Sequence, residues 1–222
     1  LHLGVGMPIA AGRPHRGFQG ELAPGSAVLV AGDAEAPAEA SARAQRAALA
    51  EQRRQRERHA PPDHLRRREG ALSLYTDGSG GRDRAGWGVA VTRVAPGGAE
   101  SLLVRHCGPV VTDPEAPPWL GAAHPTNNTA ELTGLGEALR YVVGLAEAPP
   151  AVTIASDSEY AIHAMLGIDA PRRNRRLVAR VQSLWAQARE AMAQGGGEGL
   201  FVRHVRAHQD HLPPVRRPWG WE

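Results

Sequence analysis

Three acidic residues stand where a carboxylate can hold a metal ion. The stretch "LYTDGSGG" (74–81) places Asp77 at the end of an apolar run, just before the chain breaks into glycine. Asp157 closes a second apolar run, "VTIASD", and Glu131 lies near the start of a long periodic segment. Three carboxylates brought within a few ångströms repel one another unless a cation lies between them. Hard oxygen ligands of this kind suit Mg²⁺ or Mn²⁺, with water completing the coordination shell.

Each acid also has an ordinary structural interpretation. Asp-Gly is common where a strand gives way to a turn. Glu131 could be the third residue of a capping box opened by Asn128, and Asp157 could cap a helix that begins at Ser158. Taken singly, these structural interpretations are favoured, so the elements that carry the acids have to decide whether the three meet.

The elements that carry the acids follow from hydrophobic periodicity and turn residues. In chain order they are strands at 71–77, 85–94 and 99–108, a helix at 128–146, a strand at 149–157, helices at 158–167 and 174–193, and a strand at 200–208. Short turns between the first three strands predict an antiparallel meander, and the last two strands arrive by helical crossovers. We therefore predict an α/β fold with a five-stranded mixed sheet in the order β-β-β-α-β-α-α-β. The first strand is the natural centre of this sheet, with the fourth beside it.

Two predicted helices carry an apolar stripe that should face the sheet. The stripe of the first is Leu132, Leu135, Leu139, Val142 and Val143. The stripe of the long helix is Leu177, Val181, Leu184, Trp185 and Ala188.

Residues 1–70 differ in composition from the rest and are predicted to form a low-complexity extension rich in Ala, Arg and Pro. We expect 1–37 to be disordered or loosely attached. We expect 38–59 to form an Arg-rich helix that "APPD" (60–63) stops, and we favour a solvent-exposed helix over one that contacts phosphates. All 26 basic side chains are arginine, yet the net charge is only +3. Nucleic-acid binding by the second domain, residues 71–222, must therefore rest on local basic patches.

Composition also excludes several classes of protein. A single cysteine excludes an internal disulfide. No apolar run is long enough to span a membrane, and the N-terminal stretch lacks the basic residues of a signal peptide. We expect an intracellular monomer without a membrane partner. Because the chain begins with Leu, we also expect a fragment or a processed product.

Four motifs, in order and at fitting spacing, resemble the type 1 ribonuclease H family. They are "YTDGSG" followed by "GWGVAV", then "TNNTAELTGLGEAL", "IASDSEYAI" and "HVRAH". The resemblance covers about 71–211 and implies a ribonuclease H-like fold that hydrolyses the RNA strand of RNA–DNA hybrids. It implies that Asp77, Glu131 and Asp157 hold two divalent ions, Mg²⁺ or alternatively Mn²⁺, for two-metal phosphodiester hydrolysis.

The resemblance further implies which residues contact the nucleic acid. Gly78, Ser79 and Gly80 would lie beside the minor groove, where small residues let the backbone approach the RNA 2′-hydroxyls. The other implied contacts are Asn127, Asn128, Ser158 and Tyr160. His208 would assist proton transfer or product release. Simple packing remains an alternative for Tyr160, and His204 is expected to be structural.

A local basic patch, "PRRNRR" (171–176), precedes the long helix. Its Arg172 and Arg173 are candidates for phosphate contacts. A solvated helix start remains an equal alternative, because the whole chain uses arginine so heavily.

The chain departs from the family pattern at its end, where the family has a fourth carboxylate on a final helix. Here "HQDHLPPVRRPWGWE" runs to Glu222, and Asp210 is too close to His208 for that role. Either the final helix has been cut away, which we favour, or the domain has lost the ligand. In the second case it would be a non-catalytic module that binds hybrid or double-stranded RNA. Another nuclease of the same fold, such as a resolvase, an integrase or an exonuclease, is disfavoured because those families place their acids in other local contexts.

Overall fold

The computed structural model describes residues 37–81, 83–170 and 172–206. The chain divides into two compact units, Leu1–Ser41 and Ala42–Glu222. Of the first unit, only the opening of one helix is described. The second unit contains the sheet and its helices. None of the helices in the described ranges is both long and apolar enough to cross a membrane.

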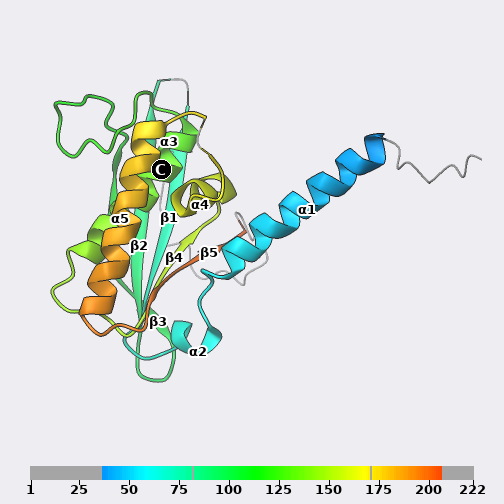
Figure 1. Cartoon of the computed structure of the whole chain (residues 1–222). Coiled ribbons are helices and arrows are strands. Elements are labelled where there is room, and N and C mark those ends of the chain that lie inside the picture. The colour runs from blue at the N-terminus through cyan, green and yellow to red at the C-terminus, as the bar shows by residue number, and fades with distance from the viewer. Residues whose placement is uncertain (1–36, 82, 171, 207–222) are drawn as a thin grey trace, which may run out of the picture. The chain divides into compact units, whose positions relative to one another are not determined.

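Ten regular elements are described (Figure 1). They are α1 (Pro37–Glu57), α2 (Asp63–Arg66), β1 (Leu72–Gly80), β2 (Ala85–Val94), β3 (Glu100–Pro109), α3 (Asn127–Val143), β4 (Val152–Ser156), α4 (Glu159–Leu166), α5 (Arg175–Gln194) and β5 (Leu200–His204). From β1 to β5 the predicted order β-β-β-α-β-α-α-β is confirmed. The short helix α2 was not predicted. The prediction that a final helix is missing falls on residues 207–222, which lie outside the described ranges.

The five strands form one mixed sheet in the order β3-β2-β1-β4-β5, with β1 at its centre as predicted. The pairs β1–β2 and β2–β3 are antiparallel, as a meander requires. The crossover strands β4 and β5 run parallel to their neighbours. In the β1–β4 pair Thr76 lies opposite Ser156, so the next residue of each strand is acidic and both acids lie at the same edge of the sheet.

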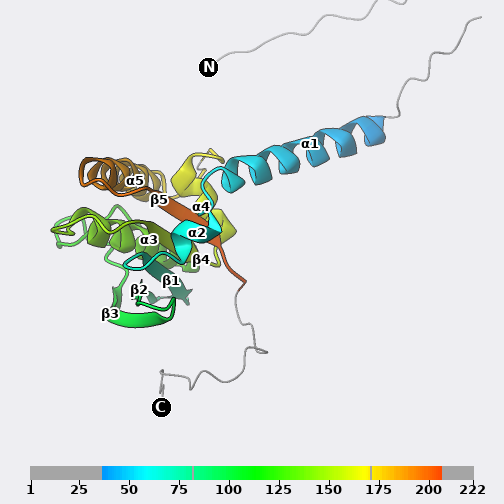
Figure 2. The ribbon, with the colours of Figure 1, turned by 90° about the horizontal axis from the view of Figure 1, so that it is seen from below.

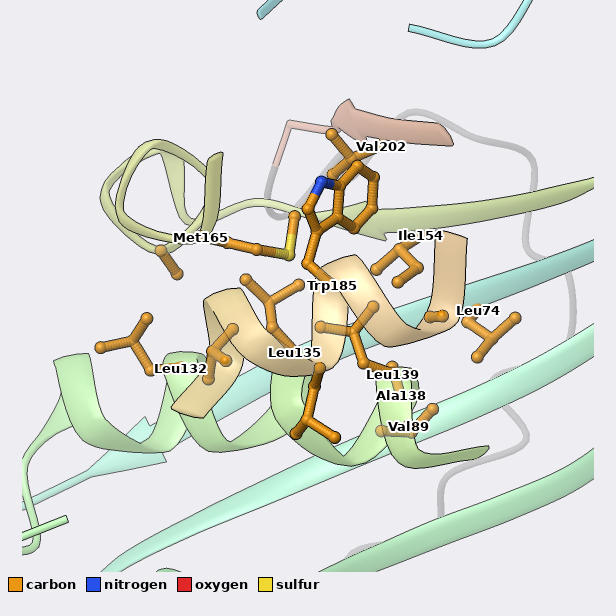
Figure 3. Close-up of a cluster of buried hydrophobic side chains, with 14 of the residues drawn as sticks. Leu74, Val89, Leu132, Leu135, Ala138, Leu139, Ile154, Met165, Trp185 and Val202 are labelled. Carbon is orange, nitrogen blue, oxygen red and sulfur yellow. The ribbon is translucent and has the colours of Figure 1, made fainter. Parts of the chain in front are cut away.

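The main core lies between the sheet and two helices. The helix α3 packs on β1 and β2, and α5 packs on α3 (Figure 2). Leucines of α3 meet apolar side chains of the central strands and of α5 (Figure 3). The predicted stripe of α5 is entirely buried. In α3 the prediction was wrong for Val143, which is 38% exposed because the helix ends there and its last turn leaves the core.

The first strand is longer than predicted. We expected Asp77 to close it, but β1 continues to Gly80, and Gly78 still pairs with Trp87 of β2. The hairpin partner extends the ladder beyond the apolar run, which the sequence period alone did not reveal. Asp77 therefore lies within a paired strand, whose backbone is held on the β2 side.

Part of the segment that precedes β1 packs against the sheet. The side chain of Leu65 in α2 is buried with Ala71, Val94 and Ala151 in a second apolar cluster, against which Phe201 packs. Residues 42–70 therefore belong to the same compact unit as the sheet.

Candidate metal centre and nucleic-acid surface

The three acids singled out by the sequence meet in space. One carboxylate oxygen from each of Asp77, Glu131 and Asp157 lies within 4.8 Å of the other two. Asp77 is exposed, Asp157 is half-buried and Glu131 is only 6% exposed. Parallel pairing of β1 with β4 brings the two aspartates together, and the packing of α3 on β1 adds the glutamate. The predicted convergence is therefore confirmed, and the cluster is open to solvent on the Asp77 side.

The electrostatics of this acidic cluster are unfavourable without a cation. Burial, then the charges of Asp157 and Asp77, raise the pKa of Glu131 to about 7, against the opposing effect of the Gly78 backbone amide. Two buried oxygens, Glu131 Oε2 and Asp157 Oδ1, have no hydrogen-bond partner within the described part of the chain. Buried polar atoms are normally paired. Unpaired carboxylate oxygens in a cluster of three converging acids fit a hard divalent cation such as Mg²⁺.

Glu131 and Asp157 do not cap helices, so the structural interpretations of these two acids were wrong. Thr126 is the N-cap of α3 and forms a reciprocal capping box with Thr129. Ser158 is the N-cap of α4, because its side chain accepts a hydrogen bond from the backbone N–H of Ala161 at 3.2 Å. Hydroxyl groups satisfy the helix ends, and both carboxylates remain available to the cluster.

Two glycines of β1 are required by the close approach of α3. A Cβ atom at Gly78 would lie 2.4 Å from the backbone nitrogen of Glu131, and one at Gly80 would lie 2.3 Å from that of Asn127. Any side chain at these positions would push α3 away from β1. The structure thus gives a packing reason for glycine where the sequence suggested only contact with nucleic acid. Ser79, between them, is exposed.

A groove of about 640 Å³ lies between the starts of α3 and α5. The predicted residues Asn127, Asn128 and Arg173 line it. The groove is also lined by His124, Asn174, Arg175 and Arg176, which the sequence analysis did not select individually. The arginines belong to the "PRRNRR" run, which the sequence indicated as a local basic patch. Only the fold places that run beside the asparagines of α3.

The remaining predicted site residues are placed differently. Arg172 is exposed but does not line the groove. The Ser158 hydroxyl is occupied by the α4 cap. Tyr160 is 38% exposed, which argues against its alternative interpretation as a packing residue. His204 Nε2 lies 3.0 Å from the backbone oxygen of Asp157, in keeping with a structural role. His208 lies outside the described residues.

The order of the strands, the helices packed on the sheet and the two aspartates just beyond the last paired residues of β1 and β4 define a ribonuclease H-like α/β fold. The RNase H family model matches residues 69–215, about two thirds of the chain. The chain therefore belongs to the RNase H family. No curated protein matches the chain.

Several solved structures are similar to this chain. The N-terminal RNase H domain of a Mycobacterium tuberculosis protein, solved as a fusion with maltose-binding protein, is 19% identical, with a TM-score of 0.44 over 63% of this chain and 84% of that one. The ribonuclease H1 of Halobacterium salinarum is 17% identical, with a TM-score of 0.40 over 62% and 87%. The LC11 ribonuclease H1, solved with an RNA/DNA hybrid, is 20% identical, with a TM-score of 0.44 over 61% and 86%.

Proposed function

We propose that this protein hydrolyses the RNA strand of RNA–DNA hybrids endonucleolytically, with two divalent metal ions. The observation that carries the proposal is the acidic cluster, in which two buried carboxylate oxygens have no hydrogen-bond partner among the residues that the structure describes. A module that only binds nucleic acid gains nothing from three carboxylates that repel one another and the phosphates. A cation between them removes both penalties.

Asp77, Glu131 and Asp157 would hold the ions, for which Mg²⁺ is the preferred candidate and Mn²⁺ the alternative. When bound, such ions activate water and stabilise the departing oxygen of the phosphodiester. Glu131 must lose its proton before it can act as a ligand, and its pKa of about 7 makes that step sensitive to pH near neutrality. Exposed Asp77 faces the side from which the scissile phosphate can approach.

The surface around the acidic cluster would orient the substrate. Asn127 and Asn128 are exposed at the start of α3, and their amides can both donate to and accept from the RNA 2′-hydroxyl. The arginines on the opposite wall of the groove suit the phosphates of either strand. Ser79 lies exposed between the two glycines that let α3 approach β1.

The test is Mg²⁺-dependent cleavage of a labelled RNA–DNA hybrid by the whole chain and by Asp77→Asn. The side chain of Asp77 is exposed, so its replacement should leave the fold intact while cleavage falls by roughly 100-fold or more. Glu147→Gln is the matched control, because it removes an exposed acid just beyond the far end of α3 and should keep full activity.

The outcomes separate the two functional hypotheses. Cleavage by the unmodified chain that is lost in Asp77→Asn, with hybrid binding retained, supports the nuclease. Hybrid binding by the unmodified chain without any cleavage would favour the non-catalytic module or a truncated nuclease that lacks the fourth carboxylate. Cleavage that persists in EDTA would show the metal-dependent mechanism to be wrong.

A further inference from the structure

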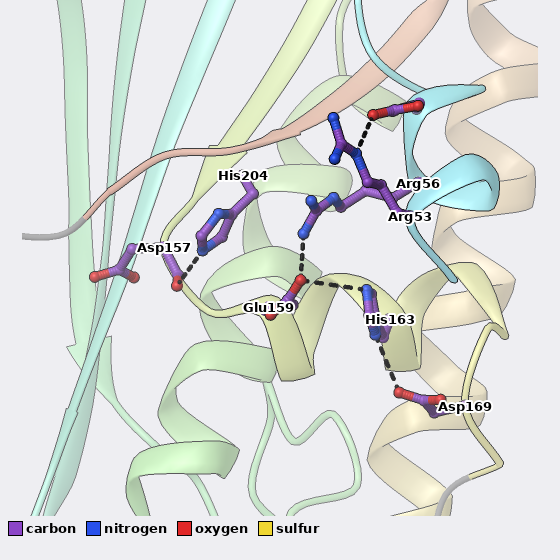
Figure 4. A network of polar contacts seen from close by, with 8 residues as sticks. Arg53, Arg56, Asp157, Glu159, His163, Asp169 and His204 are labelled. Atoms are coloured by element: carbon purple, nitrogen blue, oxygen red, sulfur yellow. Dashed lines mark hydrogen bonds and ion pairs between the residues drawn. The ribbon is translucent and has the colours of Figure 1, made fainter. Parts of the chain in front are cut away.

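The end of α1 and the residues after it brace α4. Here the brace means residues 52–59, which lie upstream of the family match that begins at residue 69. The Gln52 side-chain amide donates to Asp169 Oδ1 at 2.8 Å, just beyond the C-terminal end of α4. Arg56 forms an ion pair with Glu159, the first residue of α4 (Figure 4). The brace therefore contacts both ends of this short helix.

The brace is itself fixed to the body of the fold. The backbone oxygen of His59 accepts a hydrogen bond from the N–H of Val202, a residue of the edge strand β5, at 2.8 Å. The His59 ring stands edge-on to Trp185 of α5, with 5.9 Å between ring centroids. Because this end of the brace is anchored to a strand and a helix of the core, its contacts with α4 can restrain α4.

A buried histidine links the two contact points. His163 is 7% exposed, and its Nδ1 lies 3.1 Å from Asp169 Oδ2. Its Nε2 lies 3.9 Å from Glu159 Oε1. His163 therefore contacts Asp169 directly and lies close to Glu159, so it stands between the two acids that the brace contacts (Figure 4).

The position of Asp157 depends on this helix. Asp157 is followed directly by the α4 cap, Ser158, and then by Glu159. Its backbone oxygen accepts a hydrogen bond from His204 Nε2 of β5. The residue therefore lies between a fixed strand and the first turn of α4. If that turn shifts, the carboxylate of Asp157 moves relative to Asp77 and Glu131.

We propose that Arg56 and Gln52 are positioning residues for Asp157, which act on the metal centre through their contacts with α4. The inference deepens the proposed function, since it assumes that the acidic cluster binds divalent cations. For the Mg²⁺ affinity of an Arg56 variant, it predicts a change opposite to the one that charge alone would cause. Arg56 pairs with Glu159, two residues after Asp157. Removing its positive charge should by charge alone strengthen cation binding, whereas loss of positioning should weaken it.

The experiment measures Mg²⁺ affinity by isothermal titration calorimetry, on the whole chain without nucleic acid. The double variant Gln52→Ala/Arg56→Ala should bind Mg²⁺ about two- to tenfold more weakly, the size expected when two partly exposed polar contacts are lost. The single variant Arg56→Lys keeps a positive side chain at this position, so it should retain most of the affinity for Mg²⁺. The matched control is Arg53→Ala. It removes the same charge from the same helix, but among the described residues the ion-pair partner of Arg53 is Glu57 of α1 itself, so Mg²⁺ affinity should not change.

A second measurement does not depend on metal. Amide hydrogen exchange in EDTA should become faster at residues 159–163 in the double variant, while exchange in β1 stays unchanged. Unchanged exchange in α4, or Mg²⁺ binding as tight as or tighter than that of the unmodified chain, overturns the inference. The proposed function would be wrong if the unmodified chain bound no Mg²⁺, or if it bound Mg²⁺ without cleaving a hybrid. In either case the exchange result still decides whether the brace holds α4.

Discussion

The substitution Glu131→Gln should stabilise the metal-free protein and at the same time remove its response to Mg²⁺. The pKa of Glu131 is raised from 4.5 to about 7 in the folded chain, chiefly by burial. Because the folded state holds this proton more tightly than the unfolded state, stability is greatest at low pH. It is lost as pH rises from 4.5 through 7. Between pH 5 and pH 8 this single group should cost about 2–3 kcal/mol of unfolding free energy.

The assay is urea unfolding at pH 5 and pH 8, in EDTA and in Mg²⁺, for the unmodified chain and for Glu131→Gln. Other titrating groups cancel when the pH dependence of the variant is subtracted from that of the unmodified chain. In EDTA the difference should be about 2 kcal/mol or more, and Mg²⁺ should restore the stability of the unmodified chain alone. If both chains lost the same stability between pH 5 and pH 8, Glu131 would not carry the pH dependence. If Mg²⁺ stabilised both chains equally, Glu131 would not be a metal ligand.

Two further predictions concern packing and the groove. Gly78→Ala places a methyl group against the backbone of Glu131 and should cost about 1–3 kcal/mol in urea unfolding and weaken Mg²⁺ binding. The same change at Gly88, where a Cβ meets nothing within 4 Å, should leave stability unchanged or slightly raised. Arg173→Ala should weaken binding of hybrids of any sequence, and the slope of log K against log salt concentration should fall in magnitude by about 1. The control is Arg180→Ala, because Arg180 of α5 is exposed but does not line the groove, and its loss should leave hybrid binding unchanged. Equal salt slopes for the two arginine variants would show that the groove does not carry phosphate.

The three acids were predictable because the short motifs that carry them, taken together, resemble the ribonuclease H family, whereas each acid taken singly had an ordinary structural interpretation. "YTDG", "NNTAEL" and "IASDS" mark strand and helix ends, and the apolar steps of α3 and α5 follow from helical period. Helix caps were harder to predict. Asn128 and Asp157 were reasonable caps by residue type, but Thr126 and Ser158 do the capping. Several residues near a helix start can cap it, and only the backbone geometry selects one.

By itself, the sequence determined the order of elements and the apolar faces, because strand and helix periodicity act over a few residues at a time. The three acids were selected by the motifs taken together, through their resemblance to the ribonuclease H family. That these acids share one point was predicted, and the tertiary structure confirms it. Only the tertiary structure showed that Gly78 must be small for α3 to pack on β1, and that residues upstream of the family match reach α4. Each of these depends on contacts between segments far apart in the chain. Such contacts are fixed by the pairing of β1 with β4 and by the packing of helices on the sheet, and no local pattern encodes them.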